Sequence, residues 1–258
     1  MSKSIIVTGA GSGIGESIAR KAGDAGYKVG VLDVNTDAAE QVASSLPNGV
    51  ALHASTTDPD QVEQALDKFG ETPDALVNNA GIVRFGPLID LSFDDWRSVI
   101  EVNLTGVFIC SQVVARRMRT TGGGSIVNMT SIAGIQPNVN GGSYGSAKAG
   151  LHLLTRQMSV EWGGYGIRVN SVAPGFIDGG MSAPIFKDAE IRSTREERVP
   201  SGRLGTVDDI AHAVLFLCSE EGSYINGNQL VVDGSVTNSL MASFPRPKSV
   251  DSVGAGES

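Results

Sequence analysis

A glycine cluster directly after a short β-branched run constrains the fold of this 258-residue chain more than any other feature. The run Ser4–Thr8 and a helical pattern over residues 14–25 flank four glycines: Gly9, Gly11, Gly13 and Gly15. Glycine adopts unusual backbone angles and lets a ligand approach the main chain closely. The first turn of the following helix offers free N–H groups and the positive end of its dipole. A strand, a glycine turn and a helix in this order predict a βαβ unit that binds a dinucleotide pyrophosphate.

The second predicted strand, Lys28–Asp33, ends on an acidic residue. A carboxylate at this point can accept hydrogen bonds from both hydroxyls of an adenosine ribose. It would also repel a 2′-phosphate, and neither the glycine loop nor the residues directly after Asp33 provide a lysine or arginine. The pattern therefore predicts NAD rather than NADP as the cofactor.

Tyr144 and Lys148 lie four positions apart, so they share one face if their segment is helical. A free tyrosine has a pKa of about 10, and an ammonium group one turn away favours the phenolate. Ser131 follows an apolar run, and its hydroxyl could hold the oxygen of an alcohol or carbonyl against the phenol. The trio is suited to moving one proton on and off a substrate oxygen, although a Tyr-x-x-x-Lys pair alone also occurs by chance in helices.

With both motifs present, the sequence resembles the classical short-chain dehydrogenase/reductase family over residues 4–235. Ser131 matches the active-site serine of the family by its spacing to Tyr144. Further motifs occur in the family's order and spacing: Asn78-Asn79-Ala80-Gly81, Asn103 within residues 102–106, Pro174-Gly175 and Val231-Val232-Asp233-Gly234. Each motif is modest alone, and their combination is specific.

The resemblance implies an oxidoreductase that passes hydride between a substrate carbon and a nicotinamide ring. It implies that Tyr144 donates or accepts the proton, and that Lys148 lowers the pKa of Tyr144 and binds the nicotinamide ribose. Ser131 would stabilise the substrate oxygen, and Asn103 would hold a water that links Lys148 to solvent. The residues implied to contact NAD are Gly9, Ser12, Gly13, Ile14, Gly15, Asp33, Ser55, Thr56, Asn79, Tyr144, Lys148 and Ile177.

Two positions depart from the family pattern. Ser55 stands where the family often has an aspartate for the adenine amino group, and its hydroxyl can still accept that hydrogen bond. Gly179 stands where many members place a threonine against the nicotinamide carboxamide, and the backbone of Ile177 can still bind that group.

Alternating strands and helices predict an α/β fold, namely a single-domain, Rossmann-like, doubly wound parallel sheet with helices on both faces. Long helices are expected over residues 93–119, with Ser92 as N-cap, and over Tyr144–Trp162. The domain is expected to cover residues 1–235, with its ligand crevice at the carboxyl ends of the strands. About seven strands are expected, at Ser4–Thr8, Lys28–Asp33, 50–54, Ala75–Asn78, 125–129, 168–173 and Gln229–Val232.

Composition excludes several classes of partner. A net charge of −8 argues against nucleic acid or an anionic membrane surface. No apolar run is expected to reach the roughly 20 residues that cross a bilayer, and no signal-peptide pattern occurs at the N-terminus. Cys110 and Cys218 lie in apolar stretches and are expected to be buried, reduced thiols of a cytoplasmic protein. The three histidines lack metal-ligand spacing, so no metal is expected.

Three features concern the periphery of the domain. By resemblance, residues 181–199 form a substrate lid with a glycine hinge at its base, and a solvated amphipathic helix is an equal alternative for their charged run. The tail, residues 236–258, is expected either to be flexible or to dock Met241 and Phe244 over a neighbouring subunit's pocket. The two long helices carry surplus apolar residues, and by resemblance they predict a homotetramer, with a dimer as the alternative.

The substrate is the least determined property. The residues expected to line its site are Ser131, Gln136, Asn138, Tyr144, Phe176 and Met181, with Arg84, Phe85, Asn140 and Phe186 as further candidates. Amides, aromatics and one arginine suit a small polar secondary alcohol: a polyol, a sugar or a hydroxy acid. Alternatives are a 3-oxoacyl-carrier-protein reductase, which usually takes NADPH, and a non-catalytic dinucleotide-binding regulator, which typically lacks the tyrosine or the lysine.

Overall fold

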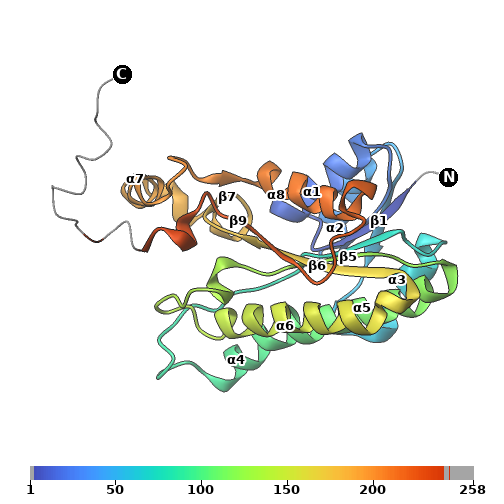
Figure 1. Cartoon of the computed structure of the whole chain (residues 1–258), viewed down its shortest axis with the longest axis horizontal. Helices are drawn as coiled ribbons and strands as arrows, with labels where there is room; N and C mark the ends of the chain where they lie inside the picture. The colour runs from blue at the N-terminus through green and yellow to red at the C-terminus, as the bar shows by residue number, and fades with distance from the viewer. Residues whose placement is uncertain (1–2, 241–243, 245–258) are drawn as a thin grey trace.

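The computed structural model describes residues 3–240 and Phe244. A seven-stranded sheet forms its centre, with the order β3-β2-β1-β4-β5-β6-β9 and every pair of neighbours parallel (Figure 1). Parallel strands require a crossover connection, and each connection between consecutive strands of this sheet contains at least one helix. The strands are β1 (Ser4–Thr8), β2 (Lys28–Asp33), β3 (Gly49–His53), β4 (Ala75–Asn78), β5 (Gly124–Met129), β6 (Ile167–Pro174) and β9 (Gln229–Val232).

Helices cover both faces of this sheet (Figure 1). One layer consists of α1 (Gly13–Asp24), α2 (Thr36–Ser44) and α8 (Val207–Cys218). The other layer consists of α3 (Pro59–Phe69), α4 (Phe93–Ile100), α5 (Gly106–Thr121) and α6 (Tyr144–Trp162). The doubly wound Rossmann-like architecture predicted from the sequence is thereby confirmed.

Alternation along the strands divides the apolar residues between two cores. In β1, Ile5 and Val7 point to the α1 and α8 layer, and Ile6 points to the layer of α3 and α5. All three are fully buried, because successive strand side chains point to opposite faces and both faces are covered.

The seven predicted strands are all present, with ends that differ by at most one residue. Two short strands in the described residues were not predicted: β7 (Ile177–Asp178) and β8 (Gly205–Thr206) pair with each other at the base of the lid segment. Each strand has only two residues, which is too short to show a periodic sequence pattern. The two strands are also far apart in the sequence, so no local signal predicts that they pair.

The helix expected over residues 93–119 is one continuous helical run with an irregularity inside it. Ser92 caps α4, and its hydroxyl accepts a hydrogen bond from the amide of Asp95 at 3.0 Å. Between α4 and α5, residues Glu101–Thr105 form a π-helical turn, η1, which contains Asn103. Single π turns within α-helices are rare and are frequent at functional sites.

This run, Phe93–Thr121, is long and apolar enough to cross a membrane by length and composition, and its most apolar 18-residue window has a mean hydropathy of 1.5. The expectation that no apolar run approaches that length is therefore wrong. Half of its most apolar window is buried inside the protein, and Val114 and Met118 are fully buried in the core. We assign its apolar character to packing on the sheet, since the core helices of globular proteins pass the same test.

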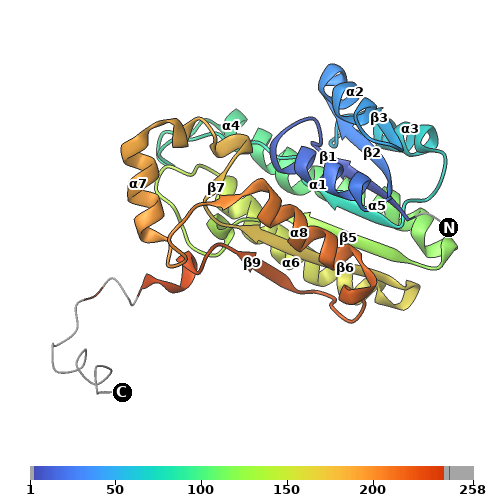
Figure 2. The same ribbon diagram turned by 90° about the horizontal axis from the view of Figure 1, so that it is seen from above.

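The lid segment contains two short 3₁₀ turns, η4 (Gly180–Ser182) and η5 (Ile185–Lys187), followed by α7 (Ala189–Arg198). Seen from above, α7 and β7 lie at the end of the sheet opposite the N-terminus, where the strands have their carboxyl ends (Figure 2). Most of the predicted tail lies outside the described residues, including Met241, so its two alternatives stay predictions.

Candidate active site

The glycine loop is tied to the end of β4 by the first asparagine after that strand. Asn79 donates from Nδ2 to the carbonyl oxygens of Thr8 and Gly9, at 3.1 and 3.0 Å. A Cβ on Gly15 would lie 2.2 Å from the carbonyl oxygen of Gly9, and Gly9 itself has a φ of +62°. Only glycine meets both demands, so this loop packs directly against the start of α1.

The carboxylate of Asp33 is held at the end of β2 by two backbone amides. Gly11 donates to Oδ2 and Asn35 donates to Oδ1, both at 2.9 Å. Asp33 lines a cavity of about 310 Å³ together with glycine-loop residues Gly9 and Gly13. Among the described residues that line this cavity, none is a lysine or an arginine.

Most of the residues predicted to contact the cofactor meet in two adjoining cavities. Gly9, Ser12, Gly13, Ile14, Asp33, Ser55, Thr56 and Asn79 line the smaller one. Ile14, Asn79 and Met181 line both cavities, and Tyr144, Lys148 and Ile177 line the larger one. Gly15 lines neither cavity. It lies in the first turn of α1, where it packs against the carbonyl oxygen of Gly9. The side chain of Ser55 already hydrogen-bonds Thr57 at 2.8 Å.

Ser131 and Tyr144 meet at the carboxyl end of β5. Ser131 follows that strand in extended backbone, and its Oγ accepts a hydrogen bond from the amide of Ala133 at 3.1 Å. Tyr144, the first residue of α6, lines the same cavity as Ser131. Burial raises the pKa of Tyr144, and the nearby hydroxyl of Ser131 lowers it by a smaller amount.

Lys148 is buried one helical turn further along α6. Its Nζ lies 5.4 Å from the ring centroid of Tyr144 and donates to the carbonyl oxygen of Met129 at 2.7 Å. Burial lowers the pKa of Lys148 to about 7, because a low-dielectric site disfavours the ammonium form. The expected lowering of the Tyr144 pKa by Lys148 is therefore wrong for this structure, where desolvation dominates both groups.

Asn103 is fully buried in the π turn and lines neither cavity. Its Nδ2 donates to the carbonyl oxygens of Ile82 and Val99, at 2.8 and 2.9 Å. Its Oδ1 has no hydrogen-bond partner among the described residues. A methyl group on Gly81 would lie 2.6 Å from this Oδ1 and 3.7 Å from Lys148 Nζ, so both polar atoms border the same small space.

The larger cavity, of about 590 Å³, holds the predicted substrate residues. Its lining includes Ser131, Gln136, Asn138, Tyr144, Phe176 and Met181, and also the candidate Phe85. The lid and the segment after β9 also contribute to the lining of this cavity. Their residues there include Ile185, Arg195, Val236 and Thr237. The first residues of the predicted tail thus line the cavity.

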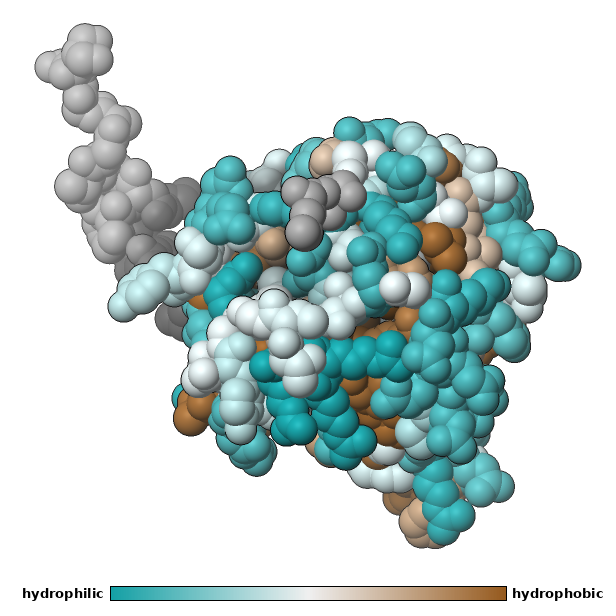
Figure 3. Space-filling model, turned by 90° about the vertical axis from the view of Figure 1, so that its right-hand side faces the viewer, coloured by the Kyte–Doolittle hydropathy of each residue, from teal (hydrophilic) through white to brown (hydrophobic). Residues whose placement is uncertain are grey.

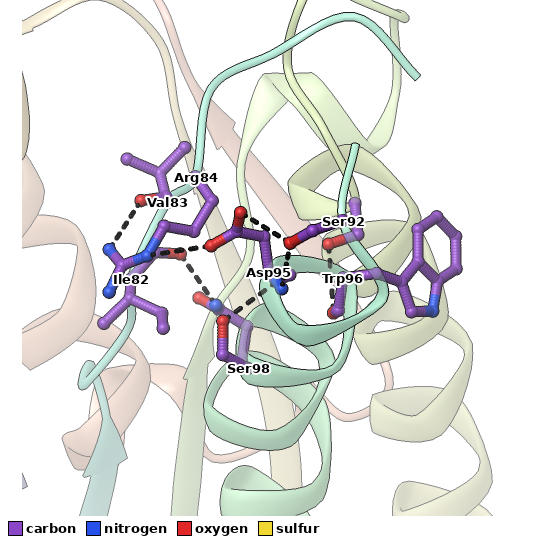
Figure 4. Close-up of polar contacts among 9 residues, drawn as sticks. Ile82, Val83, Arg84, Ser92, Asp95, Trp96 and Ser98 are labelled. Carbon is purple, nitrogen blue, oxygen red and sulfur yellow. Dashed lines mark hydrogen bonds and ion pairs between the residues drawn. The ribbon is translucent and has the colours of Figure 1, made fainter. Parts of the chain in front are cut away.

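Three candidates lie elsewhere. Arg84 turns to the start of α4, where its Nε lies 3.6 Å from Asp95 Oδ1 and its Nη1 donates to the Val83 carbonyl oxygen (Figure 4). Asn140 is a left-handed turn residue that lines neither cavity, and Phe186 is a buried residue of the lid segment that also lines neither cavity. Sequence position alone cannot show where a long side chain turns, and for Arg84 the acidic first turn of α4 decides it.

Sequence reasoning missed Arg195, Val236 and Thr237. Arg195 falls in a run of charged residues on α7 that predicts a solvated helix, and no local signal distinguishes it from its neighbours. Thr237 is held by Asp233, whose Oδ2 accepts from the Thr237 amide at 2.8 Å and from the Thr237 hydroxyl at 2.7 Å.

In the described part of the chain, no group of three or more side chains of the metal-ligating kinds lies close enough together to hold a metal ion.

A Rossmann-like sheet, a glycine loop beside a fixed carboxylate, and a Ser–Tyr–Lys cluster at the strand ends together define a dinucleotide-dependent oxidoreductase site. A family model described as enoyl-(acyl carrier protein) reductase matches residues 9–237. The chain belongs to the short-chain dehydrogenase/reductase family, whose members act on alcohol and ketone groups.

Individual relatives differ in substrate. The chain is 40% identical to cis-4-hydroxycyclohexanecarboxylate dehydrogenase of Sinomonas cyclohexanicum, over 90% of this chain and 95% of that protein. It is 39% identical to the 3-oxoacyl-[acyl-carrier-protein] reductase FabG of Thermotoga maritima, over 91% and 97%. Its structure resembles a gluconate 5-dehydrogenase from Burkholderia cenocepacia, solved with NADP and tartrate. That match has a TM-score of 0.87 and 33% identity, over 92% of this chain and 96% of that one.

Proposed function

We propose that this protein is an NAD-dependent dehydrogenase that interconverts a secondary alcohol and a ketone on a small polar substrate. The observation that carries the proposal is the meeting of Ser131, Tyr144 and Lys148 in one cavity that adjoins the glycine loop. A bound nicotinamide dinucleotide would accept the hydride that leaves the carbinol carbon. The glycine loop and Asp33 would hold it.

The chain's own residues move the proton. Ser131 donates a hydrogen bond to the substrate oxygen and keeps it beside the phenol. In the oxidation direction Tyr144 first passes its own proton toward the amine of Lys148, and the resulting phenolate takes the hydroxyl proton as the carbonyl forms. In the reverse direction the phenol returns that proton to the carbonyl oxygen. A positioned acid–base group of this kind contributes on the order of 10²–10⁴ in rate.

Lys148 and Asn103 carry the proton onward in this proposal. The Oδ1 of Asn103 is buried and has no partner within the described part of the chain, and it borders the same space as Lys148 Nζ. A buried polar oxygen without a partner is costly in free energy, and a water molecule commonly satisfies such a group. A water there would link the ammonium of Lys148 to the amide and give the proton an exit.

The choice of NAD rests on Asp33. Its carboxylate is fixed by two amides at the edge of the smaller cavity, and a 2′-phosphate beside it would meet repulsion without a compensating lysine or arginine in the described lining. The similar gluconate 5-dehydrogenase was solved with NADP. The activity of the present protein with NAD and with NADP therefore has to be compared directly.

The test is a reduction assay with NAD and, separately, NADP across secondary alcohols, polyols and hydroxy acids. We expect turnover with NAD, and a loss of roughly 10²–10⁴ in kcat on Tyr144→Phe with nearly unchanged NAD affinity, because only the acid–base group is removed. Tyr165→Phe, at an exposed tyrosine distant from the cavity lining, is the matched control.

Two outcomes would overturn the proposal. Efficient reduction of acetoacetyl thioesters with NADPH, and none of alcohols with NAD, would favour an acyl-carrier-protein reductase. Dinucleotide binding without turnover of any substrate would favour a non-catalytic regulator.

We also propose a cytoplasmic homotetramer. Free Cys110 and Cys218, whose pKa values burial raises to about 12, suit a reducing compartment. The outer face of α6 exposes Leu153 and Val160, at 63% and 82%, which suits contact with a second copy.

A further inference from the structure

Arg195 gives the larger cavity a positive charge at the lid. Among the described residues that line this cavity, Lys148 and Arg195 are the only lysine and arginine, and none is an aspartate or glutamate. The whole chain has 28 acidic and 20 basic residues and a net charge of −8. The lining of this cavity therefore has the opposite sign of charge to the protein as a whole. A cavity lined by one sign of charge attracts the opposite sign.

Two aromatic rings fix the guanidinium of Arg195. Its Cζ lies 4.8 Å from the ring centroid of Phe176 and 5.3 Å from that of Phe186. Stacking on a ring engages the flat face of the guanidinium and leaves its N–H groups free at the edge. Those donors match the geometry of a carboxylate, which a guanidinium binds with two parallel hydrogen bonds.

The neighbouring arginine on α7 shows the contrast. Arg192 pairs with Asp178 of β7 and lies 3.1 Å from Glu196, so its charge is neutralised within the protein. Arg195 is one turn further along and has no carboxylate within ion-pair distance in residues 3–240. Arg192 thus fastens the lid helix to the base of the lid, and Arg195 keeps its charge for a ligand.

We infer that Arg195 binds a carboxylate of the substrate, so that the substrate class is a hydroxy acid oxidised to the corresponding keto acid. The inference rests on the proposed function, since the reacting hydroxyl lies at Ser131 and Tyr144 in the same cavity. One guanidinium matches one carboxylate charge, whereas a phosphate dianion usually recruits several donors. The described lining offers no second cation apart from buried Lys148, which serves the reacting end.

The experiment compares each hydroxy acid with its neutral primary amide, using the full-length protein and NAD. Suitable pairs are 3-hydroxybutyrate, gluconate and 4-hydroxycyclohexanecarboxylate with their amides. The variant Arg195→Met keeps an unbranched apolar stem against the two phenylalanines. We expect kcat/KM for the acid to fall roughly 10- to 100-fold, as for the loss of hydrogen bonds to a charged group, and kcat/KM for the amide to change by less than about threefold. Arg195→Lys should retain part of the preference for the acid.

Arg192→Met is the matched control, because it removes a paired arginine from the same helix. It should change the acid and the amide alike. If Arg195→Met also lowers both alike, Arg195 only fastens the lid and the inference is wrong. A wild-type protein that prefers the amides, or a polyol phosphate, also overturns it.

A binding measurement separates this inference from the proposed function. Cyclohexanecarboxylate has no hydroxyl and cannot react, so its affinity for the NAD complex can be titrated calorimetrically. If the protein binds cyclohexanecarboxylate and Arg195→Met loses this binding, the carboxylate site is supported. If no alcohol is oxidised in the same experiments, only the dehydrogenase proposal fails. Turnover of neutral alcohols with no carboxylate binding leaves the dehydrogenase and rejects the site.

Discussion

Tyr144 and Lys148 show how a correct pairing can carry a wrong electrostatic expectation. Their i and i+4 spacing predicted that the two side chains meet, and Nζ does lie 5.4 Å from the ring centroid. The same packing removes both groups from water, which raises the pKa of Tyr144 and lowers that of Lys148. Spacing indicates proximity, but burial decides which charge state each group favours.

The buried lysine predicts a pH dependence of stability. The pKa of Lys148 is about 7 in the folded chain against 10.5 ordinarily, so between these values the unfolded chain binds a proton that the folded chain lacks. Stability linked to this group therefore rises with pH over that window. We expect the unfolding free energy of the wild type to gain about 1–2 kcal/mol more than that of Lys148→Met between pH 7 and 9.

The measurement is urea unfolding of both proteins without ligand across this range. Taking the difference between the two proteins removes the contributions of the two buried thiols, which titrate in the unfolded chain near pH 9. Parallel curves for the two proteins would show that Lys148 keeps its proton in the folded state.

The proposed preference for NAD depends on Asp33. Replacing it by Asn keeps the shape and removes the negative charge, so the preference for NAD over NADP in kcat/KM should fall roughly 10- to 100-fold, as for hydrogen bonds to a charged group. Steady-state kinetics with both cofactors measure this ratio. Asp37→Asn, at an acid in the first turn of α2, is the control. An unchanged ratio in Asp33→Asn would mean that other residues select the cofactor.

At the scale of elements, the helix over residues 93–121 shows what periodicity does not reveal. Its apolar pattern predicted one long helix, and the chain does continue without a break. The π turn Glu101–Thr105 places Asn103 toward Gly81 and Lys148. The hydrophobic pattern of the sequence does not reveal a single π-helical turn. The buried residues before and after the turn still follow the pattern of an ordinary α-helix.

The lid depends on pairing between distant segments. β7 pairs with β8 across 26 intervening residues, since Ile177 faces Gly205 and Asp178 faces Thr206. Arg192 then joins α7 to Asp178. Gly179 and Gly180 both have positive φ, and a Cβ on Gly13 would lie 2.7 Å from the Cα of Gly180. The base of the lid is therefore packed on the glycine loop.

At the scale of the whole molecule, polar and apolar surface are unevenly distributed. The end away from the lid is mostly hydrophilic, with apolar patches between its polar side chains (Figure 3). On α6, the exposed apolar residues Ala149, Leu153 and Val160 follow helical spacing, and the exposed polar residues Arg156 and Gln157 lie between the last two. Exposed apolar residues at this spacing support the proposal that this face contacts a second copy of the chain.

The exposed apolar residues of α6 predict that assembly depends on this helix. The double variant Leu153→Arg with Val160→Arg should reduce the molecular mass in solution to that of a smaller assembly, because buried charges without partners oppose association. Light scattering coupled to size exclusion measures the mass. The control, Leu153→Met with Val160→Ile, keeps the face apolar and should keep the wild-type mass. An unchanged mass in the arginine variant would place the contact elsewhere.

The strands and their carboxyl-end crevice could be predicted closely, since continuous apolar runs bounded by turns specify buried parallel strands. The residues of the glycine loop, Asp33, Ser131 and Tyr144 could be placed for the same reason, because each directly follows or ends an element. The direction of Arg84 and the role of Arg195 could not. Both are long, flexible side chains, and the neighbours that orient them come from elsewhere in the chain: Asp95 for one, Phe176 and Phe186 for the other.

The sequence by itself determined the parallel sheet, the family and the residues that meet at its edge, because periodicity and short motifs act over a few positions. The tertiary structure alone decided the direction of the pKa shifts at Tyr144 and Lys148, the Asn103 oxygen that lacks a partner among the described residues, and the position of Arg195 in the lining of the larger cavity. These depend on desolvation and on contacts between segments far apart in the chain, which no local pattern encodes.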